Sequence, residues 1–278
     1  MIETPFEWPG AVDGGVVRGR LVQPAGRGPF PCVLQVHGYT LYADWGFHPE
    51  LSRWLAARGI ASVRFDFSGD GREPGGGVDF GVLARNTYLA ELEDLAAVHR
   101  WMLAEPRIDA GRLALVGHSR GGAMGLLHAA ETGGYRTVVT WAAIDAILRF
   151  TPERLARWRR DGRIGVVHHA TRRRFELDVA VLEAAEANRE RLDILAAVQR
   201  LDAPVLVIHG ARDRSLTVDS AERLFAASRH PGSRLSIHPD AGHAFGARDP
   251  LLVPAPGRLR RLLRETVDWC AAKFRDLA

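Results

Sequence analysis

A lone serine, Ser119, stands between glycines in the stretch GHSRG, residues 117–121. The residues before it, LALV, predict a buried strand, and those after it, GGAMGLLHAA, predict a helix. A serine on a sharp strand-to-helix turn needs small neighbours, and its hydroxyl then projects from the carboxyl end of the strand. This pattern predicts that Ser119 is a nucleophile for acyl transfer. The alternative is a serine in a structural turn.

Two later apolar runs are each followed by a residue that can activate such a hydroxyl. Asp213 lies in a polar turn after PVLVIHG, and His243 lies in a glycine-containing loop after RLSIHP. The order serine, acid, histidine, with each residue just past a strand, fits a catalytic triad. Asp213 has capping of the helix from Val218 as its structural alternative. Asp145, after TVVTWAA, is a rival acid because that strand ends at the same crevice.

Backbone N–H groups are the expected donors to the oxyanion that a serine nucleophile generates. One is the amide of Arg120, directly after the nucleophile. The other is the amide of Tyr39, in the loop HGYTLYADWGF that follows CVLQV. Gly38 lets this loop approach the substrate closely. We expect the ring of His37 to pin the loop through hydrogen bonds.

Aromatic residues near these positions are candidates for an acyl or aromatic pocket. Tyr42 and Trp45 follow the oxyanion loop, while Trp141 and Phe245 lie near the expected crevice. Together with Gly38 they are the predicted substrate contacts. Burial in the core is the alternative role for about half of such aromatics.

The elements that must position these residues alternate between strand and helix. Runs that are apolar on both faces are typical of a parallel sheet covered by helices on both sides, joined by right-handed crossovers. The expected strands cover residues 32–36, 60–67, 112–116, 137–143, 204–210 and 234–239. The expected helices cover residues 49–58, 85–103, 121–131, 218–228 and 258–274. With an antiparallel hairpin before Gly26, the sequence predicts an α/β fold with a doubly wound, mostly parallel sheet.

Residues 147–200 break this alternation. They contain no convincing strand and two helical patterns, at 152–160 and 177–198, and they are too long for an ordinary connection. We therefore expect a helical lid inserted between two parts of the core, 1–146 and 201–278. A solvated helix face is the favoured role for the arginines of this lid, and binding of an acidic substrate is the alternative. These arginines include Arg154, Arg157, Arg159, Arg160, Arg163, Arg172, Arg173 and Arg174.

Composition excludes several other classes of function. The chain has 278 residues, of which 46% are hydrophobic and 25% charged, as in an ordinary soluble globular protein. Its net charge is +4, and no basic block is interleaved with aromatics, so nucleic-acid binding is not expected. The absence of an apolar signal region or membrane-length run favours a cytoplasmic protein without membrane association. Cys32 and Cys270 lie outside any C-x-x-C pattern and are expected to be free buried thiols. A homodimer stays an open alternative to a monomer.

Two further patterns are set aside as ligand sites. The glycine-rich stretch FDFSGDGREPGGG, residues 65–77, lacks the Gly-Lys-Ser/Thr ending of a phosphate-binding loop. His168 and His169 are adjacent, so their rings diverge in a helix or a strand, which disfavours a shared metal ion. The sequence predicts neither a metal nor another cofactor.

The motifs VHGYT, FDFSGDG, GHSRGG, HGARD and AGHAF, in this order, resemble the α/β-hydrolase superfamily. Within it the chain is similar to bacterial serine esterases of the cinnamoyl/feruloyl and dienelactone-hydrolase-like kind. The resemblance covers the chain outside residues 147–200. It implies an α/β-hydrolase fold with Ser119 as nucleophile, Asp213 as acid and His243 as base. It also implies that the backbone N–H groups of Tyr39 and Arg120 form the oxyanion hole.

These observations predict a serine hydrolase, with a carboxylesterase of small or medium esters as the first expectation. Ser119 would carry the acyl group, and the substrate would be a small-molecule ester. An amidase, peptidase or acyltransferase with the same triad is the alternative, because the acyl-enzyme step is shared. A receptor-like protein that keeps the fold without turnover is a third interpretation. Related enzymes often carry Gln, Met or Leu after the nucleophile, where this chain has Arg120.

Overall fold

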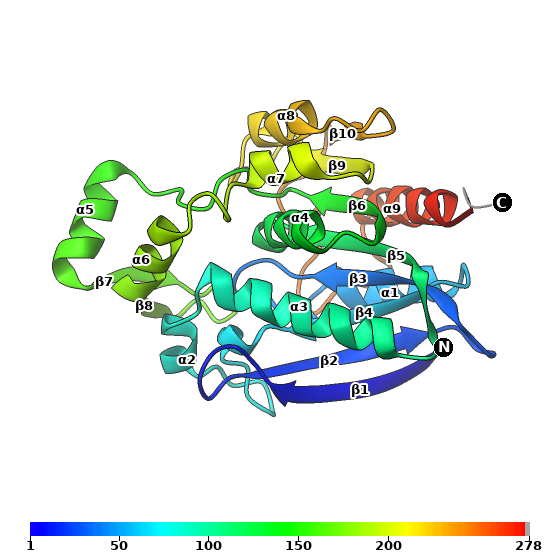
Figure 1. Cartoon of the computed structure of the whole chain (residues 1–278), viewed down its shortest axis with the longest axis horizontal. Coiled ribbons are helices and arrows are strands. Elements are labelled where there is room, and N and C mark those ends of the chain that lie inside the picture. Colours follow the sequence, from blue (N-terminus) through cyan, green and yellow to red (C-terminus); the bar gives the residue numbers. More distant parts are fainter. Residues whose placement is uncertain (276–278) are drawn as a thin grey trace.

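The computed structural model describes residues 1–275, which form one eight-stranded sheet flanked by helices (Figure 1). The strand order is β1-β2-β4-β3-β5-β6-β9-β10. The first two strands form an antiparallel hairpin, β2 is antiparallel to β4, and the other neighbours are parallel, which confirms the doubly wound sheet. The strands are β1 (Ile2–Pro9), β2 (Val16–Gln23), β3 (Phe30–Val36), β4 (Ala61–Asp66), β5 (Ile108–His118), β6 (Tyr135–Trp141), β9 (Val205–Gly210) and β10 (Arg234–His238).

Helices cover both faces of this sheet. One face packs against α1 (Phe47–Ala56) and α9 (Gly257–Arg275). The other packs against α3 (Tyr88–Ala104), α4 (Arg120–Thr132), α7 (Ile194–Arg200) and α8 (Val218–Ala227). Along β5, Leu113 and Leu115 point into the core on the α3–α4 face, while Ala114 and Val116 point into the core on the α1–α9 face. The strand is therefore apolar at successive positions. Within residues 1–275, no helix combines the length and apolar character needed to cross a bilayer.

The segment 147–200 differs from the predicted helical lid without strands. It holds α5 (Pro152–Asp161) and then an antiparallel hairpin of β7 (Arg163–Val167) and β8 (Arg174–Asp178). The predicted long helix at 177–198 is instead two helices, α6 (Val179–Ala187) and α7. The prediction was wrong because each strand is only five residues long, which is too short for its pattern of buried and exposed residues to stand out in the sequence. Two short elements were also not predicted: the 3₁₀ turn Ser68–Asp70 and α2 (Phe80–Ala84).

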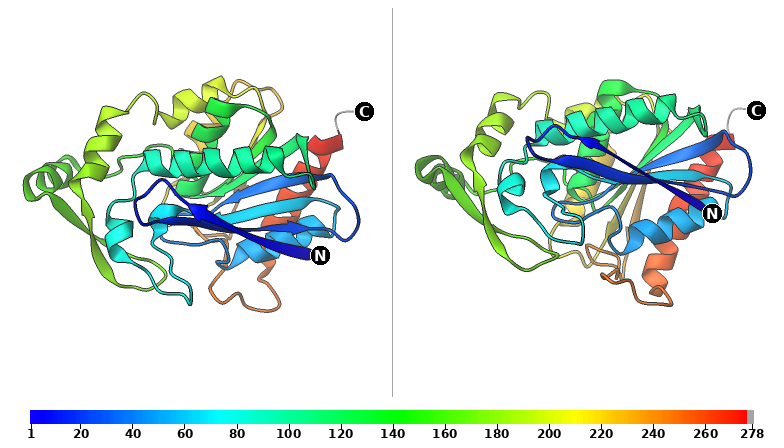
Figure 2. Two further views of the ribbon diagram at one scale, coloured as in Figure 1. Left: turned by 60° about the horizontal axis from the view of Figure 1, so that its bottom comes forward. Right: turned by 90° about the horizontal axis from the view of Figure 1, so that it is seen from below.

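The inserted elements form a cap beyond the carboxyl ends of the parallel strands. Figure 2 shows α5 and the β7–β8 hairpin projecting from this end of the sheet. Trp158, Ile164 and Leu177 build a separate apolar cluster there with Leu182 of α6 and Leu83 of α2. By contrast, α7 packs against α4 and α8 on the sheet. The cap therefore lies over the sheet edge at which the predicted site residues end their strands.

Candidate active site

Ser119 occupies a sharp turn between β5 and α4. Its backbone has φ 54° and ψ −121°, a conformation that costs energy for a residue with a Cβ atom and that recurs at functional sites. The backbone N–H of Ser119 donates to the carbonyl of Trp141 at 2.9 Å, which ties the turn to the neighbouring strand β6. The turn therefore presents the hydroxyl at the carboxyl edge of the sheet, as the sequence pattern predicts.

The glycines around Ser119 are required by space. A Cβ atom on Gly121 would lie 2.1 Å from the carbonyl oxygen of His37. A Cβ on Gly117 would lie 2.5 Å from the carbonyl oxygen of Gly121. Real Cβ atoms do not come this close to other atoms. Glycine at position 121 therefore lets α4 pack against the loop after β3, and glycine at position 117 lets the turn close onto the start of α4.

Gly121→Ala is expected to lower the free energy of unfolding by about 1–3 kcal/mol, because the new methyl group must displace the backbone at His37. Activity should fall as well, since the displaced loop leads directly into the predicted oxyanion amide. Gly165→Ala is the matched control, because no atom lies within 4 Å of the position that its Cβ would take. Its stability should change by no more than about 0.5 kcal/mol. Denaturant unfolding of both variants measures the difference, and equal stabilities would contradict the packing argument.

The structure brings Ser119, His243 and Asp213 together in one hydrogen-bonded chain. The Ser119 hydroxyl lies 3.1 Å from Nε2 of His243. Nδ1 of the same ring lies 2.7 Å from Oδ2 of Asp213. Asp213 follows β9 and His243 follows β10, so neighbouring parallel strands deliver both residues to the turn after β5. This is the geometry of a nucleophile, a base and a group that orients the base.

Asp213 is held as a carboxylate. Its side chain is fully buried, and its Oδ1 accepts the backbone N–H groups of Ser215 at 2.7 Å and Leu216 at 3.0 Å. Burial alone would raise the pKa of Asp213, but the hydrogen bond from His243 and those backbone donors lower it below its usual value. The fixed negative charge faces Nδ1 of His243, so it favours the tautomer whose Nε2 is free to accept the serine proton.

The loop that carries His243 is anchored by a second histidine. Nε2 of His118, the residue before the nucleophile, donates to the backbone carbonyl of His243 at 3.1 Å. Burial lowers the pKa of His118 to about 3, so its ring is neutral at physiological pH. His118 therefore positions the loop without adding a charge beside His243.

Two backbone N–H groups close to Ser119 in the chain or in space have no hydrogen-bond partner among the described residues. Neither the Tyr39 amide nor the Arg120 amide donates a hydrogen bond to any residue from 1 to 275. A Cβ on Gly38 would lie 2.8 Å from Nδ1 of His118 and 3.3 Å from Cβ of Ser119, so glycine permits this close approach. Both amides are therefore available to an oxyanion.

The ring of His37 holds the loop after β3, as predicted. Its Nδ1 donates to the carbonyl of Gly38 at 2.9 Å, and its Nε2 lies 2.9 Å from Oδ2 of Asp70. Burial opposes protonation of this ring, but the carboxylates of Asp70 and Asp66 outweigh it and raise the pKa of His37 to about 9. His37, Asp66 and Asp70 lie close enough to hold a metal ion. Nδ1 is hydrogen-bonded, Nε2 lies at ion-pair distance from Asp70, and the raised pKa favours the protonated ring, so an ion pair that fixes the loop accounts for the cluster.

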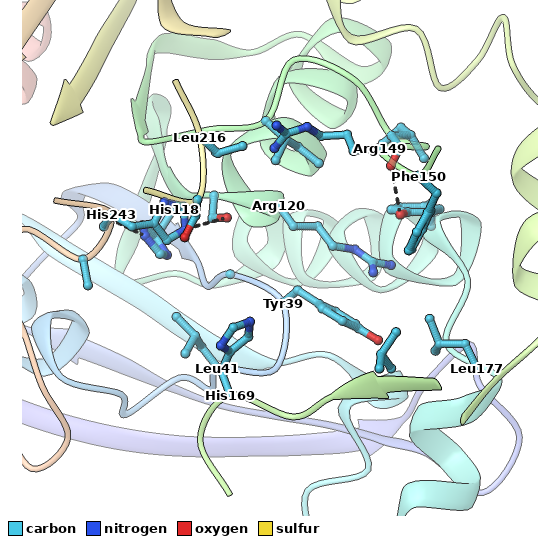
Figure 3. Close-up of a pocket in the computed structure, with 18 of the residues that line it drawn as sticks. Tyr39, Leu41, His118, Arg120, Arg149, Phe150, His169, Leu177, Leu216 and His243 are labelled. Atoms are coloured by element: carbon cyan, nitrogen blue, oxygen red, sulfur yellow. Dashed lines mark hydrogen bonds between the residues drawn. The ribbon is translucent and has the colours of Figure 1, made fainter. Parts of the chain in front are cut away.

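A cavity of about 410 Å³ opens beside Ser119, between the sheet edge and the cap (Figure 3). Its size is typical of a small-molecule site. The catalytic end is formed by Ser119, His243 and the loop after β3, including Gly38, Tyr39 and Trp45. The remaining wall is mostly apolar and comes largely from residues that the sequence did not single out: Leu41, Tyr88, Ile144, Ile147, Phe150, Trp158, Val166, Leu177, Val181, Leu216 and Ala244.

Three predicted substrate contacts lie elsewhere. Trp141 is fully buried in the core between the sheet and α9, where its Nε1 donates to Thr266. Phe245 is fully buried in the same core. Tyr42 does not line the cavity, and its hydroxyl donates to Asp249. Sequence position near the crevice did not distinguish residues that face the cavity from residues that support it.

Other candidates have partners away from the triad. Asp145, the alternative candidate for the acid, accepts a hydrogen bond from Nε of Arg223 at 2.6 Å and not from His243. Nδ1 of His168 accepts the backbone N–H of Thr171, whereas His169 lines the cavity. The arginines that line the cavity are Arg120 and Arg149. Several arginines of the cap are instead exposed and ion-paired with acidic neighbours: Arg157, Arg159, Arg160 and Arg163.

Some cavity residues had a signal in the sequence. Trp158 stands three positions after Leu155 in the arginine-rich stretch PERLARWRRD, a spacing typical of the inward face of a helix. Tyr88 had no such signal. It opens α3, a core helix, and reaches the cavity because its hydroxyl donates to the carbonyl of Ile147 at 3.2 Å.

Comparison with known proteins agrees with this architecture. The model of the prolyl oligopeptidase family matches residues 45–275. The uncharacterized peptidase YuxL of Bacillus subtilis is 29% identical over 240 residues, covering 83% of this chain and 34% of that protein. The chain thus spans about a third of the length of this relative. The peroxisomal succinyl-coenzyme A thioesterase of Mus musculus is 22% identical over 265 residues, covering 92% of this chain and 58% of the thioesterase.

Solved structures share the fold. Est1E from Butyrivibrio proteoclasticus with bound ferulic acid superposes with a TM-score of 0.74 at 18% identity. The match covers 94% of this chain and 97% of Est1E. At this identity the likeness establishes the α/β-hydrolase fold.

Proposed function

Because this chain belongs to the prolyl oligopeptidase family and is a serine hydrolase of the α/β-hydrolase fold, we propose that it cleaves small or medium carboxylic esters. The observation that carries the proposal is the hydrogen-bonded chain from Asp213 through His243 to Ser119, beside two unpaired backbone amides. An acyl group on Ser119 and an oxyanion at the amides of Tyr39 and Arg120 are the intermediates that such a site stabilises.

The reaction follows from these positions. The hydroxyl of Ser119 attacks the ester carbonyl while Nε2 of His243, 3.1 Å away, takes its proton. The carboxylate of Asp213 stabilises the imidazolium that forms. The two amides donate to the negatively charged oxygen, an effect worth about 3–4 kcal/mol for each donor in comparable sites. His243 then protonates the leaving alcohol, and water activated by the same ring releases the acid.

The cap supports a small ester as substrate. The cavity of about 410 Å³ lies under α5 and the β7–β8 hairpin and is lined mainly by apolar side chains. A folded polypeptide does not fit a space of this size. One relative is named a peptidase and another a thioesterase, and these names refer to different leaving groups, so the leaving group is the feature that needs a direct test.

A leaving-group panel with one constant butyryl group provides that test. We expect turnover of the p-nitrophenyl ester and no measurable turnover of the butyryl anilide, because an amide carbonyl is less electrophilic than an ester carbonyl and an anilide is the poorer leaving group. Measured kcat/KM values for the ester, the thioester and the anilide give the order directly. A kcat/KM for the anilide above that for the ester would overturn the assignment to esters in favour of an amidase.

A further inference from the structure

The cavity has two ends with different roles in an esterase reaction. Nε2 of His243 must reach the leaving oxygen, so the alcohol lies on the histidine side of Ser119 and the acyl group extends the other way. Figure 3 shows the side chains of Arg120 and Tyr39 running side by side away from His243, toward Leu177 of the cap. This end is therefore the acyl end of the cavity.

Hydrogen-bond donors without acceptors gather along the acyl end. Nε1 of Trp158 has no partner, although this side chain is only 1% exposed. The hydroxyl of Tyr39 is likewise buried without a partner. Nη2 of Arg120 lies 2.9 Å from Oε1 of Glu91 without an aligned hydrogen bond. All three side chains line the same cavity.

Unpaired buried donors of this kind are costly. The Trp158 indole and the Tyr39 hydroxyl each lose a hydrogen bond to water, at about 1–3 kcal/mol, unless something in the cavity replaces it. Arg120, by contrast, keeps its ion pair with Glu91. Two of the three groups, the indole N–H and the guanidinium, only donate, and the Tyr39 hydroxyl donates as well. Burial raises the pKa of Tyr39, which keeps this hydroxyl protonated. The complementary group is therefore an acceptor oxygen.

Arg120 is held rigidly for such a role. Its Nε donates to Oε2 of Glu91 at 3.0 Å, and its guanidinium stacks on the rings of Tyr88 and Tyr39 at 3.9 and 4.7 Å. No aspartate or glutamate is among the described residues that line the cavity, so no acceptor side chain competes with a ligand there. Most of the other residues that line the cavity are apolar, as an alkyl linker requires.

We propose that the acyl end of the cavity selects acyl groups that carry an acceptor oxygen, a carbonyl or carboxylate, remote from the ester bond. Trp158, Tyr39 and Arg120 are the specificity-determining residues. This inference rests on the proposed esterase activity and adds the chemical class of its acyl group. An unsubstituted alkyl chain leaves the donors unpaired, whereas a remote oxygen satisfies them.

Two esters that differ by one carbonyl test the proposal. In ethyl 6-oxoheptanoate, four methylene groups separate the ester carbonyl from a ketone, a length comparable to that of the Arg120 side chain. Ethyl heptanoate has a methylene group in place of the ketone. We expect kcat/KM to be at least about tenfold higher for the ketone. Monoethyl adipate places a carboxylate at the same position, and its kcat/KM distinguishes an anionic from a neutral acceptor. Equal or lower kcat/KM for both oxygenated esters, relative to ethyl heptanoate, would overturn the proposal.

Substitutions of single donors by phenylalanine test which residues cause the preference for the ketone. Trp158→Phe removes the unpaired N–H and keeps a ring, so the preference for the ketone over ethyl heptanoate should fall about tenfold. Tyr39→Phe should lower the same ratio. Trp54→Phe is the control, because its Nε1 donates to Glu50 on α1 and lies outside the cavity. An unchanged ratio in both Trp158→Phe and Tyr39→Phe would contradict the assignment. Failure of the wild type to cleave any of the three esters would instead refute the esterase function itself.

Discussion

Ser119→Ala is expected to lower kcat/KM for p-nitrophenyl butyrate by about 10⁶-fold, the scale seen when a triad nucleophile is removed. The reason is geometric. Oγ of Ser119 is the atom 3.1 Å from Nε2 of His243, and no other hydroxyl is hydrogen-bonded to that nitrogen within residues 1–275. Steady-state kinetics on the purified variant measure the loss. The remaining rate comes from substrate binding and the backbone amides alone.

The Ser119 variant should fold normally. The strained backbone at φ 54° is already present with serine, and alanine keeps the same Cβ atom. The backbone hydrogen bond from Ser119 to Trp141 also survives. Circular dichroism and denaturant unfolding should therefore match the wild type. A variant that is folded and retains more than a few per cent of activity would show that another residue carries the acyl group.

Asp213→Asn is expected to reduce kcat by about 10⁴-fold with little change in structure. The asparagine carbonyl can keep the hydrogen bonds from Ser215 and Leu216, which leaves the amide NH₂ facing Nδ1 of His243. That NH₂ donates where the carboxylate accepted, so it favours the tautomer with the proton on Nε2. This nitrogen then cannot accept the proton of Ser119. Pre-steady-state acylation with a p-nitrophenyl ester measures the affected step.

Asp145→Asn is the matched control for the acid. Asp145 also follows a strand at the same sheet edge, but its carboxylate accepts from Arg223. Its replacement should leave kcat within about twofold and cost at most about 1 kcal/mol of stability, as for an ion pair with an exposed arginine. A large loss of kcat in Asp145→Asn, with activity kept in Asp213→Asn, would exchange the two assignments.

The sequence allowed the sheet and the three polar residues at its edge to be predicted, because their signals are local. The apolar runs before Ser119, Asp213 and His243 specify strands, and parallel strands bring their carboxyl ends together. The glycines beside Ser119 complete the G-x-S-x-G pattern of a strand-to-helix turn, which is itself a local signal. Such features depend on neighbours in the chain, so one sequence is enough to recognise them.

The cap and the cavity wall depend on contacts that the sequence does not display. Strands β7 and β8 are short and pair with each other, so the sequence alone shows no convincing strand in this segment. Trp141 stands near the crevice along the chain, but its ring is buried against α9, where it donates to Thr266, 125 residues later. Phe245 is buried in the same core. The side chain of Arg120 was not assigned a role because its partner Glu91 lies on another helix.

Labelling with a fluorophosphonate probe tests the central claim most directly, since the probe reacts with a serine only when a base activates it. After trypsin digestion, the account predicts one adduct, on the peptide of residues 113–120, LALVGHSR, and no adduct there in a His243→Ala variant. An unlabelled Ser119 in folded protein, or a stable adduct on a different serine, would contradict it.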